Sequence, residues 1–147
     1  MTNEKQMMAL TIWQPHAALF FLPEDIRKRY ETRSWACPKK LIGQRIAIHA
    51  GLNQTDINLL RFSPEDCDFD WVVKKAFGAV SNLLPTLGCV IGTAVISDCI
   101  EGHLLKEPGP FGDFSEGMWA WRMESPVKFD KPIPAKGSQG FWKWKKN

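Results

Sequence analysis

The strongest structural signal in this sequence is an apolar stretch at residues 89–100, which is rich in valine and isoleucine. Such residues favour β-strands because their branched side chains pack well on a pleated surface. Gly92, inside this stretch, indicates a β-bulge or a close approach of another backbone segment. Residues 9–12, 45–49 and 118–124 also have strand-like patterns. The chain is therefore expected to build a sheet from one long strand and several short ones.

Two helical regions interrupt these strands. Pro15 fits the first position of a short helix, and the apolar residues 17–21 predict that this helix is buried. Residues 53–85 have a helical pattern and are interpreted as an insertion between strands, while the prolines in residues 127–134 predict an edge strand. We interpret residues 1–147 as a single α+β domain. Five or six short strands around a buried helix favour a small β-barrel, and an open α+β sheet fits the same pattern.

Composition narrows the possible partners and location. The net charge is +3, and both ends of the chain are basic while the middle is acidic. This asymmetry suits an anionic partner, although lysines that keep a tail soluble give the same pattern. The apolar runs are too short to span a bilayer and the N-terminus has no apolar signal core, so we expect no membrane partner and no export. The four cysteines form no C-x-x-C pair, which argues against zinc and favours a reducing, cytoplasmic location.

The densest group of chemically active side chains lies at residues 27–35, which contain four cations, one carboxylate and two aromatic rings. An extended chain here places Glu31, Arg33 and Trp35 on one face. Arginine offers a planar fork to a phosphate or a base edge, and aromatic rings offer faces for base stacking. The alternative is a solvated charged turn that leads into an edge strand. Most of the seven tryptophans are expected in the core.

Gln14, His49 and Asp98 are further candidates because each lies at a strand end beside apolar residues. Gln14 and His49 could line a cleft or could satisfy buried backbone groups, which is the commoner role. Asp98, like Glu101, could act as an acid or base or could form a turn. The sequence lacks the P-loop, dinucleotide-binding, nucleophile-elbow and H-E-x-x-H motifs, so those four chemistries are set aside. We predict neither a cofactor nor a metal.

Taken in order, six short motifs resemble the ASCH domain, a branch of the PUA-like superfamily. The resemblance covers nearly the whole chain except residues 53–85. The six motifs are residues 9–15 (ALTIWQP), 28–35 (KRYETRSW), 46–50 (IAIHA), 92–94 (GTA) with Asp98, 118–121 (MWAW) and 137–142 (GSQGFW).

This resemblance implies a pseudo-barrel with a cleft between barrel and helix that binds single-stranded RNA, a nucleoside or a nucleotide. The family's Lys-x-x-Glu-x-Arg loop is expected to line the cleft, and a glutamine at the helix start is expected to meet it. The expected cleft residues are Lys28, Glu31 and Arg33, with Gln14, Trp35 and His49 as further ligand-binding residues.

The resemblance also implies two alternatives. One branch of the family is similar to amidohydrolases that deacylate N-acetylcytidine with a lysine, a threonine and a glutamate, and other members cleave RNA. Lys28 matches the lysine, Glu31 stands where the threonine is expected, and Asp98 or Glu101 would supply the third group. Because a carboxylate favours the charged form of a lysine, Lys28 with Glu31 fits an ion pair that orients a ligand better than an activated amine. Glu31 itself could then act as the general base on water, with Lys28 or Arg33 holding the developing oxyanion. The third alternative is a protein-interaction module.

Overall fold

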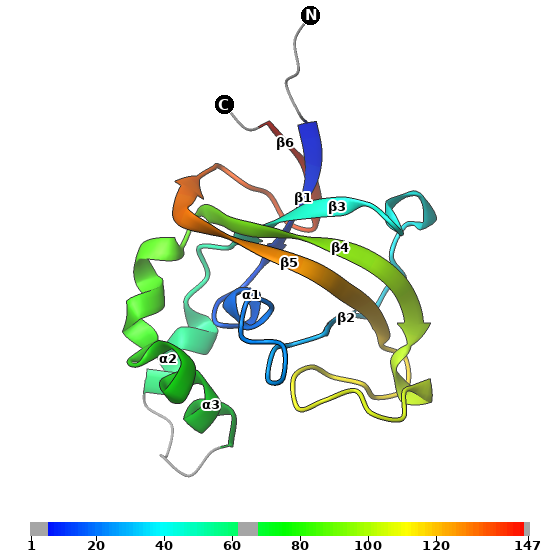
Figure 1. Cartoon of the computed structure of the whole chain (residues 1–147), viewed down its shortest axis with the longest axis horizontal. Helices are drawn as coiled ribbons and strands as arrows, with labels where there is room; N and C mark the ends of the chain where they lie inside the picture. Colours follow the sequence, from blue (N-terminus) through cyan, green and yellow to red (C-terminus); the bar gives the residue numbers. More distant parts are fainter. Residues whose placement is uncertain (1–5, 62–67, 146–147) are drawn as a thin grey trace, which may run out of the picture.

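The computed structural model of this protein describes residues 6–61 and 68–145 (Figure 1). Within these ranges the chain forms one six-stranded sheet, three α-helices and three short 3-10 helices. The strands are β1 (Gln6–Ile12), β2 (Tyr30–Arg33), β3 (Arg45–Ala50), β4 (Cys89–Glu101), β5 (Trp119–Pro134) and β6 (Phe141–Lys145). The helices are α1 (His16–Leu19), α2 (Thr55–Arg61) and α3 (Asp68–Phe77), and the 3-10 helices are η1 (Lys39–Leu41), η2 (Val80–Thr86) and η3 (Gly102–Leu104).

The sheet is mixed and open. Its strand order is β2-β5-β4-β3-β1-β6, in which β1 and β3 run parallel and all other neighbours run antiparallel. Across the described residues, the two end strands β2 and β6 do not pair with each other, so the sheet is not closed. The α+β class is confirmed, whereas the closed barrel stays a prediction.

The longest strands, β4 and β5, differ in how well the sequence predicted them. The strand expected at residues 89–100 is confirmed as β4. The expected separation of residues 118–124 from 127–134 is wrong, because both lie in the single strand β5. Ser125 kinks this strand with a φ of 50°, and shifts in the β4–β5 register absorb the kink. The second half of β5 pairs with β4 alone among the described strands, which confirms the predicted edge.

Gly92 confirms both of the expectations drawn from its place in the strand. A Cβ atom at this position would lie 2.4 Å from the carbonyl oxygen of Val127 and 2.6 Å from the ring of Phe21, closer than atoms can pack. The pairing of β4 with both of its neighbours also shifts register beside Gly92. Only glycine therefore fits at the point where β4 lies against both β5 and Phe21, which follows α1.

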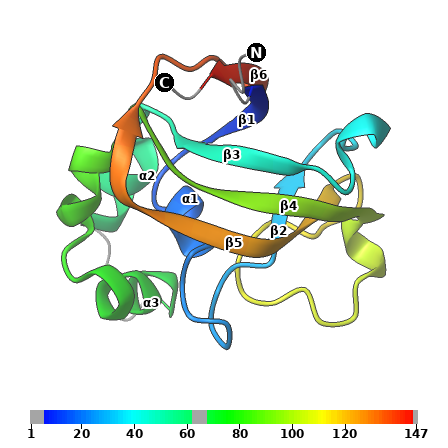
Figure 2. The ribbon, with the colours of Figure 1, turned by 45° about the horizontal axis from the view of Figure 1, so that its top comes forward.

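Helix α1 is buried, as predicted, but it is shorter than the apolar run indicated. Pro15 precedes the helix as its N-cap, and the helix ends at Leu19 with Phe20 as its C-cap. One side of α1 packs through Ala17 and Phe20 onto the sheet. The other side packs through Ala18 and Leu19 onto the α2, α3 and η2 region, which confirms the helical insertion. Figures 1 and 2 show α1 under the curved sheet with α2 and α3 beside it.

No helix within the described ranges is both long and apolar enough to cross a membrane.

Candidate functional site

An open pocket of about 550 Å³ lies where the end of β1, the start of α1, β2 and α2 meet the loop at residues 110–113. We call it the central pocket. Three of the predicted site residues, Lys28, Glu31 and Arg33, line it together. The sheet edge, the buried helix and the insertion thus bring residues from distant parts of the chain to one opening.

Glu31 is the centre of a buried group of charges in this pocket. Its Oε1 accepts a hydrogen bond from Lys28 Nζ at 3.2 Å, and its Oε2 accepts one from Arg33 Nε at 2.8 Å. The Arg33 guanidinium also donates to the backbone oxygen of Thr11 at 3.1 Å, which ties it to β1. Glu31 and Arg33 share a face of β2 because they are two residues apart in a strand. The backbone of Lys28 donates to the carbonyl of Leu19, which ties it to α1.

The electrostatics of this group favour binding over proton transfer. Burial by itself raises the pKa of Glu31, but the Lys28 ammonium and the Arg33 guanidinium lower it below the ordinary value for a carboxyl group. The carboxylate is therefore ionised at neutral pH, and both of its oxygens are already engaged by cations. Two cations share the Glu31 carboxylate, so this group carries one net positive charge, while Asp56 and Asp113 add carboxylates elsewhere in the pocket lining. Charges of both signs held in fixed positions can orient a strongly polar ligand.

A second polar pair, His16 and Asp56, faces the same pocket. The two side chains lie 2.9 Å apart between His16 Nε2 and Asp56 Oδ2, and both are partly exposed. Burial lowers the pKa of His16 most, the charge of Lys28 lowers it further, and Asp56 opposes the shift without reversing it. His16 is therefore neutral near pH 7, in a form that can accept a proton or a hydrogen bond.

Of the two exposed tryptophans within the described residues, Trp13 and Trp35, only Trp13 lines this pocket. Trp13 is 44% exposed and lines the opening next to Thr11. Trp35, which was the predicted stacking residue, is 40% exposed but lies outside the pocket lining. Its ring packs edge-on against Trp121 at 4.8 Å between centroids, and its carbonyl accepts a hydrogen bond from the Trp121 indole. The free aromatic face at the central pocket is therefore that of Trp13.

Gln14 and His49 are placed as structural residues outside the central pocket. Gln14 is fully buried, donates to Thr86 Oγ1 at 2.9 Å and accepts from the backbone N–H of Ala18 at 3.0 Å. Its amide thus fastens the start of α1 to η2. His49 lies 2.9 Å from the Ala135 carbonyl through Nε2, and through Nδ1 it lies 3.1 Å from a threonine hydroxyl on β1. These are the backbone-satisfying roles that the sequence analysis set beside cleft lining.

Asp98 lies on the exposed side of β4, away from the central pocket lining. It stands opposite Arg122 in the β4–β5 register, and its carboxylate accepts a hydrogen bond from the next backbone N–H at 2.8 Å. The structure therefore does not bring Asp98 together with Lys28 and Glu31. The third catalytic group expected from the amidohydrolase resemblance has no counterpart at this position.

Sequence reasoning missed Trp13, His16 and Asp56. Trp13 and His16 flank the Gln14-Pro15 pair, which the resemblance had already singled out, so their nearness to the cleft was within reach of the sequence. Asp56 belongs to the insertion, and no local pattern indicates that α2 folds back beside α1.

Within the described residues, no group of three or more histidine, cysteine, aspartate or glutamate side chains is placed to hold a metal ion. Cys37, Cys89 and Cys99 carry free thiols, and Cys67 lies outside the described residues. Burial, together with the neighbouring Cys99, raises the pKa of the Cys37 thiol to about 11, so it is not a ready nucleophile.

In comparisons with known proteins, no protein-family model and no curated protein matches this sequence.

Proposed function

We propose that this chain is a PUA-like domain of the ASCH type, with its curved sheet as the pseudo-barrel, and that its central pocket binds single-stranded RNA or a modified nucleoside. The observation that carries this proposal is the buried Lys28–Glu31–Arg33 group at the wall of an open pocket. A buried charge group is costly to maintain, since each ion loses its hydration. Its placement at an opening, rather than in the core, is what recognition of a polar ligand needs.

The exposed face of Trp13 adds the second element of nucleic-acid recognition. Single-stranded nucleic acids are bound by a basic groove combined with aromatic rings on which bases stack. Trp13 is exposed and lines the central pocket together with the Lys28–Glu31–Arg33 group. The polar side chains of Arg33 and Thr32, which line the same pocket, would be available to the polar edge of a base stacked on Trp13.

The proposal is tested by measuring the affinity for single-stranded RNA octamers over a range of salt concentrations. We expect the affinity to fall as salt rises, with a slope of about −0.7 for each phosphate contact in a plot of log K against log salt concentration. Replacing Trp13→Ala is expected to weaken binding by roughly 1–3 kcal/mol, the usual contribution of one stacked base.

Trp35→Ala is the matched control, because Trp35 has similar exposure but lies outside the pocket. We expect this variant, once shown to be folded, to bind RNA as the unmodified protein does. Absence of RNA binding at any salt concentration, or an equal loss in both variants, would contradict the proposal. A folded protein that ignores RNA would favour the interaction-module alternative.

A second candidate function, hydrolysis of N-acetylcytidine, is favoured by the His16–Asp56 pair in the same pocket. Neutral His16 could take a proton from a water molecule while the water oxygen forms a bond to the acyl carbon. Arg33 or Lys28 would hold the oxyanion that develops on the acyl oxygen. The bond between that carbon and the exocyclic nitrogen then breaks, the nitrogen regains a proton, and cytidine and acetate leave. This arrangement gives the base role to a residue other than Glu31, whose pKa is lowered.

Chromatography of N-acetylcytidine incubated with the protein distinguishes the two candidates. Release of cytidine that is lost in both His16→Gln and Lys28→Ala would establish the hydrolase. If folded, unmodified protein releases no cytidine, the hydrolase candidate fails and the binding function is retained.

A further inference from the structure

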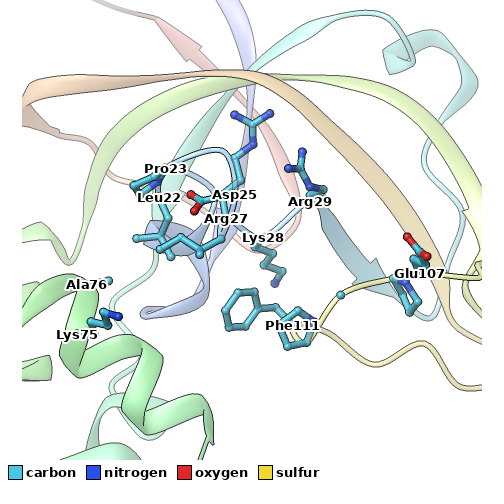
Figure 3. Close-up of a pocket in the computed structure, with 14 residues that line it drawn as sticks. Leu22, Pro23, Asp25, Arg27, Lys28, Arg29, Lys75, Ala76, Glu107 and Phe111 are labelled. Atoms are coloured by element: carbon cyan, nitrogen blue, oxygen red, sulfur yellow. The ribbon is translucent and has the colours of Figure 1, made fainter.

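A second pocket, of about 600 Å³, opens beside the central one (Figure 3). We call it the side pocket. Its walls are the segment 22–29, the end of α3 and the loop at residues 107–111. The helical insertion, which the sequence left without a role, thus forms one wall of this pocket through Lys75 and Ala76.

The two pockets share a wall. Lys28, Pro110 and Phe111 line both of them. Figure 3 shows the Lys28 side chain directed toward Phe111, while the guanidinium groups of Arg27 and Arg29 point to the other side of their segment. The two pockets are therefore neighbours, with Lys28, Pro110 and Phe111 between them.

The lining of the side pocket combines apolar faces with cations. Leu22 and Phe111 are buried in its floor, and Ile26 is 45% exposed at its edge, which is unusual for so apolar a side chain. Lys28 and Lys75 supply positive charge to this lining, against the carboxylates of Asp25 and Glu107, while the guanidinium groups of Arg27 and Arg29 point away from Lys28 and Phe111. An apolar surface with a cationic rim suits a nucleic-acid base whose backbone phosphate lies at the edge.

The two arginines carry positive charge that the described structure does not commit to a carboxylate. Arg27 Nε is buried and has no hydrogen-bond partner, a rare condition for a buried polar atom. The Arg29 guanidinium donates to the backbone carbonyl of Glu24, a neutral acceptor that leaves its charge intact. Their charge therefore adds to the positive field around the segment that borders both pockets.

We propose that the side pocket holds the nucleotide next to the one in the central pocket, so that the ligand is an oligonucleotide rather than a free nucleoside. This inference rests on the proposed function, because it takes the central pocket to be a nucleotide site. Lys28, at the shared wall, then lies between two successive nucleotides. In this arrangement Lys75 and Ala76 of the insertion contact the second nucleotide, so an oligonucleotide binds more tightly than a single nucleoside.

The test compares two substitutions at one exposed lining position. Ala76→Glu adds a negative charge at the side pocket, and Ala76→Gln adds a side chain of the same size without charge. Both proteins and the unmodified one are titrated with adenosine, cytidine and uridine, and with the homo-octamers of the same three nucleosides. We expect octamers to bind more tightly than nucleosides, and Ala76→Glu to weaken octamer binding about tenfold relative to Ala76→Gln, through repulsion of a nearby phosphate. Nucleoside affinity is expected to be equal in the two variants.

The outcomes separate this inference from the function on which it rests. If nucleosides bind but octamers bind no more tightly, or if the two Ala76 variants bind octamers equally, the side pocket is not a nucleotide site and the proposed function stands. If neither nucleosides nor octamers bind to folded protein, the proposed function fails and the inference fails with it.

Discussion

At the scale of single residues, the site depends on one carboxylate that serves two cations. Glu31 accepts from Lys28 and from Arg33, and the side chains of Glu31 and Lys28 are almost fully buried. Removing one member of such a group leaves an uncompensated charge in the interior, which costs far more than the intact pair contributes. Stability and ligand orientation are therefore coupled at Glu31.

We predict that Glu31→Gln lowers the free energy of unfolding by about 3 kcal/mol, because Lys28 is left buried without a counter-charge. Urea unfolding followed by tryptophan fluorescence measures this. Glu124→Gln is the control, since the Glu124–Arg122 ion pair is exposed and is expected to change stability by less than about 1 kcal/mol. Similar losses of unfolding free energy in Glu31→Gln and Glu124→Gln would show that the buried ion pairs of Glu31 stabilise the fold no more than the exposed Glu124–Arg122 pair does.

His16 makes stability depend on pH. Its pKa is lowered in the folded protein, mainly by burial, so below about pH 6.5 the unfolded chain binds a proton that the folded chain resists. Stability is therefore full above that pH and falls as the pH decreases. His49, whose pKa burial also lowers, adds to the same trend.

We predict that His16→Gln makes the fall in stability between pH 7.5 and 5 less steep without abolishing it, because His49 remains. Unfolding midpoints in urea at several pH values give this slope. His103→Gln, which replaces an exposed histidine, is the matched control. An unchanged slope in His16→Gln would contradict the assignment of a neutral, buried His16.

At the scale of elements, β4 and β5 show which features a sequence determines locally. The Val/Ile-rich run predicted β4 because the first part of this strand is buried on both faces, where apolar, branched side chains pack well. The joining of β5 across Ser125 was not predictable, because the continuity of that strand depends on its pairing with β4. The central pocket was predictable as far as Lys28, Glu31 and Arg33, which share one short segment.

The rest of the pocket was not predictable, because it is a product of tertiary folding. Asp56 reaches the pocket only because α2 packs against α1. The loop at residues 110–113 reaches it only because the chain returns beside β2. The sequence placed Trp35 at the site on the basis of strand alternation. That alternation ends with β2 at Arg33, two residues earlier.

At the same scale, we predict that Gly92→Ala destabilises the protein by about 1–3 kcal/mol, because a Cβ atom would overlap the Val127 carbonyl and force β4 and β5 apart. Thermal unfolding measures the loss. Asp98→Ala, at an exposed position of the same strand, is the control and is expected to stay within about 0.5 kcal/mol. A neutral Gly92→Ala would mean that the two strands are less closely spaced than described.

At the scale of the whole molecule, the fold brings Trp13, His16 and the Lys28–Glu31–Arg33 group together at one pocket beside α1. The sheet covers one face of this helix, and the insertion covers the other. The central and side pockets open where these layers end, on either side of Lys28 and Phe111. The basic segment between α1 and β2 thus borders both pockets, an arrangement that the proposed binding of single-stranded nucleic acid would use.

The most direct test of this account is an amide and indole NMR titration of the protein with a single-stranded RNA octamer. The account predicts that the largest shifts fall on Trp13, His16, Arg33 and residues 111–113, which line the central pocket. Trp35 and Asp98, which lie outside it, are expected to change little. Shifts centred on Trp35 and Asp98, or no shifts at all, would contradict the claim that the central pocket binds RNA.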